Sequence, residues 1–348
     1  MLSPGNLAIA VARQLRQPVV EVADTSASKV HGSTGRATAE VCRLQGTARD
    51  RWGRMLPWRL TVKTLCEPGA ADDDARSPNH WTFWRREALA YESVLLPNNN
   101  HGLDSVECFG VFSDDRHEGG VAVALDTVDA DAIWDLDQFA KAAGLLGQWQ
   151  AGWARRVPPV EWLAQDQLGQ RIGQTEANGG LVQPDWSRPA LAAAFPQERQ
   201  GQLQAVWERR WAWLERLASG SSTLTHGDFS RGNLFAGGDG RVVVIDWAAL
   251  GLAPAGFDLA HLVLSALNDM GGSASVEDVQ TTLVGEYLSA FDPRLHDEVR
   301  RAFAVTAALT ATSRLCWTLT RTVEPAAVEH WARLVPWIVA SGHAAGSA

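Results

Sequence analysis

Two kinds of hydrophobic pattern divide the chain. In the first third, short runs rich in β-branched and apolar residues alternate with glycine-containing or charged turns, as expected for β-strands. Five such runs are predicted to be strands, at residues 19–30, 37–48, 58–65, 106–114 and 120–129. One helix is predicted between the third and fourth runs, at 80–96, where apolar side chains recur at helical spacing up to Pro97.

Most of the remaining sequence is helical in pattern. A helix opens the chain at Ser3-Pro4, and only residues 224–247 look β-like in the second half. Further helical stretches are predicted at 135–156, within 159–219, and at 257–268, 276–291 and 294–341. The pattern therefore predicts a small β-rich part at 1–128, a connector near Asp126–Val128, and a larger helical part at 129–348.

Composition narrows the class of protein. The 348 residues are 46% hydrophobic and 20% charged, which is typical of a globular protein with a sizeable core. The net charge of -9 argues against a nucleic-acid partner and is compatible with a cationic small molecule. There is no apolar run of 18 residues and no signal-peptide pattern, so we expect no membrane span and no cleaved leader. The four cysteines are scattered without zinc-binding spacing, which favours a reduced, cytoplasmic setting.

Residues 224–250, LTHGDFSRGNLFAGGDGRVVVIDWAAL, concentrate polar groups at the ends of a predicted hairpin. Asp228 and Asn233 lie five positions apart on a glycine-broken loop, and Asp246 ends the run VVVI. A carboxylate on such a loop can orient a hydroxyl group and accept its proton. An amide and a second carboxylate can complete an Mg²⁺ site with phosphate oxygens. Alternatively, Asp228 and Asn233 form only turn hydrogen bonds, but the joint pattern with Asp246 favours the metal site.

This joint pattern resembles the aminoglycoside phosphotransferase and choline kinase-like family of the protein-kinase-like superfamily. The matching residues are His226-Gly227-Asp228, Asn233 and Ile245-Asp246-Trp247, and the order of predicted strands and helices matches along nearly the whole chain. The resemblance implies an α+β, bilobal protein-kinase-like fold with a small five-stranded antiparallel N-lobe and a larger, mainly helical C-lobe. It also implies that Asp228 is the catalytic base, while Asn233 and Asp246 hold Mg²⁺ on the triphosphate of ATP or GTP.

A kinase-like N-lobe needs a lysine on its third strand to contact the nucleotide phosphates. Lys63 lies inside WRLTVKTL, the third predicted strand. Its expected partner is Glu87 on the following helix, because Glu92 lies about one and a half turns later and is expected to face elsewhere. Two alternatives stay open. Lys63 can point to water from an edge strand, and Glu87 can pair with Arg85, Arg86 or a neighbouring turn.

The resemblance also implies nucleotide contacts from two backbone segments. The turn between the first two strands is the candidate cover for the phosphates, although it lacks a G-x-G-x-x-G pattern and is nearly as typical of an ordinary hairpin turn. The connector is expected to bind adenine through backbone amide and carbonyl groups. The residues concerned are Gly32, Ser33, Thr34 and Gly35 in the turn, and Asp126, Thr127 and Val128 in the connector.

Four residues around the loop are candidates for supporting roles. Ser230 and Arg231 lie between the base and the metal ligand, where either can touch the transferring phosphoryl group, and an outward-facing Arg231 is the alternative. Asp258 precedes a helical run and is either an N-cap or a brace for the backbone of the loop, two roles that are compatible. His226 is expected to hold the loop through hydrogen bonds.

The predicted enzyme is a kinase that phosphorylates a hydroxyl group of a small molecule, acting as a monomer or homodimer. An aminoglycoside-like antibiotic or an amino sugar ranks first as the acceptor, followed by another sugar, a nucleoside or an amino alcohol. Acidic residues of the helical part can bind ammonium groups or form solvated helix faces: Asp135, Asp137, Glu161, Asp166, Glu176 and Asp185. Tryptophans of the same region can stack on a sugar or nucleoside: Trp134, Trp149, Trp153 and Trp162.

Two other classes of protein match less well. A protein kinase usually carries arginine where this chain has Gly227, and Phe-Gly where Trp247-Ala248 follows Asp246. No A-P-E-like signature follows in the sequence. A non-catalytic kinase-like module usually lacks one of the catalytic positions, whereas Lys63, Asp228, Asn233 and Asp246 are all present here.

Overall fold

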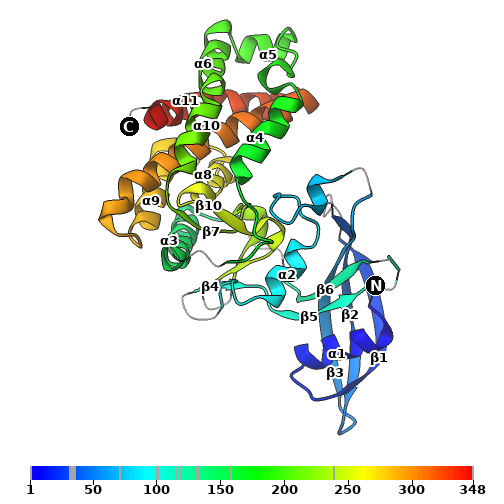
Figure 1. Ribbon diagram of the computed structural model, residues 1–348. Coiled ribbons are helices and arrows are strands. Elements are labelled where there is room, and N and C mark those ends of the chain that lie inside the picture. The colour runs from blue at the N-terminus through cyan, green and yellow to red at the C-terminus, as the bar shows by residue number, and fades with distance from the viewer. Residues whose placement is uncertain are drawn as a thin grey trace. The chain divides into compact units, whose positions relative to one another are not determined.

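The computed structural model describes residues 2–30, 37–69, 72–98, 102–114, 116–117, 119–129, 133–154, 156, 159–237 and 240–346. The chain divides into two compact units. Unit 1 comprises Met1–Asp131, Val160–Ala164 and Phe235–Leu250, and unit 2 comprises Ala132–Pro159, Gln165–Leu234 and Gly251–Ala348. Figure 1 shows the helices and strands of each unit.

A five-stranded antiparallel sheet forms the main part of unit 1. Its strands are β1 (Val20–Lys29), β2 (Thr38–Asp50), β3 (Met55–Leu65), β5 (Cys108–Ser113) and β6 (Val121–Asp126). The order across the sheet is β1-β2-β3-β6-β5, and every strand is antiparallel to its neighbours. All five runs that the hydrophobic pattern predicted as strands therefore belong to one sheet.

The two faces of this sheet pack against different helices. On one face, α1 (Pro4–Gln14) begins at the N-cap Ser3 and packs on a cluster that includes Leu60 and Val62 of β3. On the other face lies α2 (Arg86–Glu92), whose Ala88 packs in a second cluster with Val123 of β6. Because side chains alternate between the faces of a strand, Lys63 extends from the face that α2 covers.

A second, smaller sheet completes unit 1. It has the order β4-β9-β8, with β4 (Leu103–Ser105) parallel to β9 (Val242–Val244) and β8 (Leu234–Ala236) beside β9. Next to this parallel pair, Arg241 Nη1 lies 2.8 Å from Asp104 Oδ2. The sheet matters for the site because β9 leads directly into Asp246.

Unit 2 consists of helices around one pair of strands. The strands β7 (Ser222–Thr225) and β10 (Gly251–Pro254) are antiparallel. The helices are α3 (Leu136–Trp153), α4 (Gln167–Ala177), α5 (Pro189–Ala194), α6 (Gln197–Glu208), α7 (Arg210–Ala218), α8 (Phe257–Asp269), α9 (Val276–Leu288), α10 (His296–Arg321) and α11 (Pro325–Gly346). α8 is buried along most of its length and packs against α3, α9 and α10, while α10 and α11 lie side by side (Figure 1).

In the part of the chain that the structure describes, five short 3₁₀ turns join these elements. They are η1 (Asp74–Arg76), η2 (Gly180–Val182), η3 (Arg231–Asn233), η4 (Trp247–Ala249) and η5 (Pro293–Leu295). Two of them matter for the site, because η3 ends on Asn233 and η4 begins directly after Asp246.

Several element predictions need correction. The helix predicted at 80–96 is only Arg86–Glu92, since residues 78–85 form turns around the buried Arg86 side chain. The single helix predicted at 294–341 is two helices, separated at the extended residue Thr322 and restarted at Pro325. Two strands, β4 and β10, escaped prediction because three or four residues are too few to establish a periodicity.

Two expectations from composition concern membranes and cysteine. Among the described residues, no helix combines the length and apolar character that crossing a bilayer requires. The four cysteines, Cys42, Cys66, Cys108 and Cys316, are not joined in disulfides.

Candidate active site

Lys63 of β3 is held between two carboxylates of unit 1. Its ammonium Nζ lies 2.6 Å from Glu87 Oε2 and 2.8 Å from Asp246 Oδ1. The Glu87 side chain is 1% exposed, whereas that of Asp246 is 43% exposed. The expected Lys63–Glu87 partnership is therefore present, and the alternative of a lysine pointing to water is wrong. The assigned catalytic roles of these residues stay predictions.

Burial and neighbouring charges shift the pKa values of Lys63 and Glu87 in opposite directions. Burial by itself would lower the pKa of Lys63, but attraction to Glu87 and Asp246 outweighs it and raises the pKa above its ordinary value. Burial raises the pKa of Glu87 to about 7, although the Lys63 ammonium opposes this shift. The cluster thus keeps a positive charge on Lys63 at neutral pH, in a position fixed by the Glu87 carboxyl group and the Asp246 carboxylate.

Asp246 has an unusual backbone conformation. It follows β9 and is the N-cap residue of η4, with φ 61° and ψ 63°, in the left-handed region that aspartate tolerates better than most residues. This conformation turns the chain sharply at the end of the strand. The turn presents the carboxylate to Lys63 on one side and leaves it partly open to solvent.

Arg86, the residue before Glu87, links several segments of unit 1 through its hydrogen bonds. From the sequence, it was considered only as a possible partner for Glu87. Its side chain is fully buried and donates to five backbone carbonyls, those of Pro78, His80, Trp81, Trp162 and Ala248. Burial lowers the pKa of the guanidinium. The side chain thereby joins α2, which carries Glu87, to η4, which follows Asp246.

Replacing Arg86 with methionine is expected to destabilise the protein strongly. Methionine fills much of the space but donates no hydrogen bond, so five carbonyls lose a partner. We expect the free energy of unfolding to fall by about 3–5 kcal/mol, measured by urea unfolding followed through tryptophan fluorescence. Arg85→Met is the matched control on an exposed neighbour and should change stability by less than about 0.5 kcal/mol. Equal effects of the two substitutions would contradict the assigned role of Arg86.

The loop that carries Asp228 lies in unit 2, directly after β7. The Asn233 side-chain nitrogen donates to the Asp228 carbonyl at 2.9 Å and lies 3.3 Å from its Oδ2. The backbone amide of Ser230 donates to the same carbonyl at 2.8 Å. Gly227 has φ +90°, which favours glycine at this position. Because the amide nitrogen of Asn233 is engaged, its amide oxygen is the atom suited to a metal.

Asp258 braces the backbone of this loop. Its carboxylate accepts hydrogen bonds from the backbone amides of His226 at 2.7 Å and Gly227 at 3.0 Å, and from Gln150 Nε2 at 2.8 Å. The structure therefore shows the bracing contacts and no side-chain cap by Asp258 itself, since Gly256 occupies the N-cap position of α8. His226 also contributes, because its Nδ1 accepts the Asp228 amide at 3.1 Å.

Asp258→Asn is expected to loosen the loop that carries Asp228. One amide group would replace a carboxylate that accepts three donors, so at least one buried donor loses its partner. We expect the free energy of unfolding to fall by about 1–3 kcal/mol and kcat to fall about tenfold or more. Glu277→Gln, on the exposed start of α9, is the control and should change neither quantity.

The loss of stability in Asp258→Asn should depend on pH with a defined sign. Burial raises the pKa of Asp258 to about 6, with His226 and the two backbone amides opposing the shift. A pKa above its unfolded value stabilises the fold at low pH, and that contribution is lost as the pH rises through about 6. The stability difference between wild type and the Asp258→Asn variant should therefore be larger near pH 5 than near pH 8. A difference that grows with pH would contradict the assignment.

Two arginines contact the loop, and sequence reasoning missed both. Arg314 of α10 places Nη2 3.3 Å from Asp228 Oδ1, and both side chains are partly exposed, at 34% and 40%. The buried Arg171 of α4 donates to the Gly227 carbonyl at 2.9 Å. Neither residue belongs to a local motif, so only the packing of α4 and α10 reveals them.

Other predicted site residues have mixed outcomes. The Arg231 guanidinium donates to the Leu234 carbonyl at 2.7 Å and packs 4.7 Å over the Trp134 ring. These contacts anchor its side chain inside unit 2, and a phosphoryl contact by Arg231 or Ser230 stays a prediction. The predicted phosphate-covering residues lie outside the described part of the chain: Gly32, Ser33, Thr34 and Gly35.

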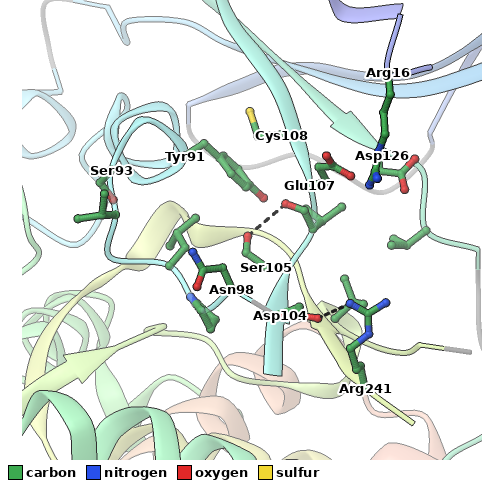
Figure 2. Close-up of a pocket in the computed structure, with 16 residues that line it drawn as sticks. Arg16, Tyr91, Ser93, Asn98, Asp104, Ser105, Glu107, Cys108, Asp126 and Arg241 are labelled. Atoms are coloured by element: carbon green, nitrogen blue, oxygen red, sulfur yellow. Dashed lines mark hydrogen bonds and ion pairs between the residues drawn. The ribbon is translucent and has the colours of Figure 1, made fainter. Parts of the chain in front are cut away.

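The connector residues border a cavity of about 500 Å³ within unit 1. Asp126 and Val128 line it together with Tyr91 of α2 and the Asp104–Arg241 pair, which Figure 2 shows among the lining side chains. Thr127 is buried, and its hydroxyl lies 3.2 Å from that of Thr61. Adenine binding by this segment stays a prediction. The Lys63 cluster contributes no residue to this cavity.

Similar solved structures identify the fold. An aminoglycoside 2'-phosphotransferase-IIIa in its GDP complex superposes with a TM-score of 0.53 at 12% identity, over 97% of this chain and 99% of that one. The amicoumacin kinase hAmiN, in complex with AMP-PNP, Ca²⁺ and Ami, gives 0.51 at 14% identity, over 88% and 87%. The choline kinase LicA from Streptococcus pneumoniae gives 0.50 at 16% identity, over 91% and 94%. These likenesses confirm the α+β, protein-kinase-like fold.

The sequence itself identifies the family. The profile of the phosphotransferase enzyme family matches residues 84–301, more than half of the chain. The chain therefore belongs to this family, and the prediction of a small-molecule phosphotransferase is confirmed. The match includes Glu87, Asp228, Asn233 and Asp246, whereas Lys63 lies before it. Comparison with curated protein sequences gives no significant match.

Proposed function

We propose that the protein is a magnesium-dependent kinase that transfers the γ-phosphoryl group of ATP or GTP to a hydroxyl group of a small molecule. The observation that carries the proposal is the Lys63 ammonium held by Glu87 and Asp246 at 2.6 and 2.8 Å. A buried lysine paired in this way supplies a fixed positive charge for nucleotide phosphates. The nucleotides bound to two similar structures, AMP-PNP and GDP, support a nucleotide as the phosphoryl donor.

The chemical step assigns one role to each loop residue. The Asp228 carboxylate accepts the proton of the acceptor hydroxyl group while the oxygen of that hydroxyl group bonds to the γ-phosphorus. The bond from that phosphorus to the bridging oxygen breaks, and its electron pair leaves on the nucleoside diphosphate. Asp258 and His226 keep the loop in position during this step, and Lys63 offsets the charge on the phosphates.

The donor atoms suit a magnesium ion. Asn233 offers an amide oxygen, and Asp246 offers a carboxylate that is 43% exposed. Mg²⁺ prefers such oxygen ligands and completes its shell with phosphate oxygens and water. Among the described residues, no group of three or more His, Cys, Asp or Glu side chains is placed to hold a metal ion. When bound, Mg²⁺ would neutralise charge on the triphosphate.

The preference for a cationic acceptor gains little support from the acidic residues predicted to bind it. Three of them have structural partners inside unit 2. Asp135 caps α3, Glu176 pairs with Arg210, and Asp185 accepts from Ser187. An aminoglycoside-like antibiotic or amino sugar remains one candidate class, beside sugars, nucleosides and amino alcohols.

A transfer assay tests the proposed activity. The full-length protein is incubated with ATP or GTP, Mg²⁺ and a panel of antibiotics, sugars, nucleosides and amino alcohols. We expect at least one acceptor to gain the mass of a phosphoryl group, and the gain to disappear when EDTA removes the metal. Transfer to protein serines in place of small molecules would favour a protein kinase. Nucleotide binding without any transfer would favour a non-catalytic module.

A further inference from the structure

We propose that Arg314 recognises the acceptor, and that the acceptor carries a carboxylate or another anionic group near the hydroxyl that receives the phosphate. This inference rests on the proposed function, since it concerns the substrate of that same site. It reverses the preference for a cationic acceptor that net charge and scattered acidic residues had suggested.

Arg314 lies directly beside the predicted base. It projects from α10, a helix of 26 residues whose middle is otherwise largely buried. Its Nη2 lies 3.3 Å from Asp228 Oδ1, and its side chain keeps 34% of its surface exposed. An acceptor hydroxyl that reaches the Asp228 carboxylate must therefore arrive beside this guanidinium.

The Arg314 guanidinium has donors that the protein does not use among the described residues. Among the described residues, the Asp228 carboxylate is the one hydrogen-bond partner of this guanidinium. A guanidinium carries five N–H donors in a planar fork, which matches a carboxylate or phosphate in two parallel hydrogen bonds. Most of these donors remain for a ligand, at an exposed edge of the predicted reaction site.

The charged groups around Asp228 differ in whether a ligand can reach them. Arg171 contacts the loop from α4, and its burial removes the shielding that water would provide. The second carboxylate at the loop, Asp258, is fully buried and bound to three donors, so it offers nothing to a ligand. His226, whose Nδ1 accepts the Asp228 amide, is buried, and so is His261. The group next to Asp228 that is open to a ligand is therefore a cation.

A purely structural role for Arg314 makes a different prediction. If the arginine only orients Asp228, its loss should lower kcat by the same factor for every acceptor. If it binds an anionic group, its loss should raise KM for acidic acceptors alone. Comparing acceptors in which one group is changed from neutral to anionic or cationic separates the two roles.

The experiment uses two matched sets of acceptors with the full-length protein. One set is glycolate, ethylene glycol and ethanolamine, and the other is glucuronate, glucose and glucosamine. Phosphate transfer and direct binding by calorimetry in the presence of AMP-PNP are measured for wild type, Arg314→Gln and Arg314→Lys. Arg300→Gln is the control, because Arg300 lies on the same helix and pairs with Asp297 at 3.4 Å at an exposed position.

We expect wild type to favour the acidic member of at least one set by about tenfold or more. Arg314→Gln should lower kcat/KM or affinity for that acid by about 10–100-fold, chiefly through KM, and change the neutral and amine members less than about threefold. Arg314→Lys should restore part of the loss, since it keeps the charge but not the fork. Arg300→Gln should behave as wild type.

Several results would overturn the inference. These are a preference for the amine members, equal losses for all three members in the Arg314→Gln variant, and neither binding nor transfer of either acid. Acid binding that depends on Arg314 without transfer to any acceptor would support this inference while contradicting the proposed kinase activity. The binding and transfer measurements thus test the two claims separately.

Discussion

Asp228→Asn is expected to lower kcat for phosphoryl transfer by about 10²–10⁴-fold while changing nucleotide affinity less than about twofold. Asparagine keeps the size of the side chain and an oxygen for the Arg314 contact, but it cannot accept the hydroxyl proton. Nucleotide affinity should persist because the Lys63 cluster belongs to unit 1, whereas Asp228 lies in unit 2. Steady-state kinetics with any acceptor found by the transfer assay, together with calorimetric nucleotide binding, measures both effects.

Two further variants make this prediction sharper. Asp228→Ala removes the partner of Arg314 and should reduce kcat at least as much as the asparagine variant. Glu329→Ala, at an exposed position on α11, should leave all parameters unchanged. If turnover of the asparagine variant stays within about tenfold of wild type, less than a general base typically contributes, then Asp228 is not the base.

Asp246→Asn is expected to produce the second large effect. The substitution removes the Asp246 carboxylate, which holds Lys63 together with Glu87 and is also predicted to bind Mg²⁺. Asparagine also adopts left-handed backbone conformations, so the turn after β9 should survive. We expect kcat to fall about 10²-fold or more, and the Mg²⁺ concentration for half-maximal activity to rise about tenfold or more.

The control for Asp246→Asn is Asp73→Asn, on an exposed segment of unit 1, which should behave as wild type. A magnesium titration of transfer at saturating nucleotide gives both quantities. An unchanged metal requirement together with a large loss of kcat would mean that Asp246 acts through Lys63 alone. That result would remove Asp246 from the proposed metal site.

The sequence was most informative where a local pattern carries the information. Each strand of the five-stranded sheet has at least six residues, enough for its apolar and β-branched character to show. The spacing of Asp228, Asn233 and Asp246 could be recognised because all three lie within one loop and hairpin. The Lys63–Glu87 pair was predicted from the family resemblance, which implies a lysine on the third strand and a glutamate on the following helix, and helix geometry then favoured Glu87 over Glu92.

The sequence was least informative where distant segments meet. β4 pairs with β9, more than a hundred residues later, over three residues each, and no periodicity reports such a pairing. Arg86 was considered only as a partner for Glu87, yet its partners are backbone carbonyls, which leave no trace in sequence. Arg314 reaches Asp228 from 86 positions away through the packing of α10.

Substrate preference illustrates the same limit. Net charge and scattered acidic residues suggested a cationic acceptor, because a sequence lists charges without their partners. In the structure, Glu176 is paired with Arg210 and Asp135 caps a helix, so these carboxylates serve the fold. The exposed charge beside Asp228 is instead the guanidinium of Arg314.

In the proposed reaction, this protein moves a phosphoryl group from a nucleotide to a small-molecule hydroxyl by means of Asp228. The most direct measurement uses ATP and GTP labelled at the γ-phosphate and follows the label into a pooled set of neutral, cationic and anionic alcohols. We expect wild type to place the label in a small-molecule phosphate ester, and Asp228→Asn to transfer at least about 10²-fold less label. Equal transfer by the two proteins, or label that leaves the nucleotide only as inorganic phosphate, would contradict the proposed reaction.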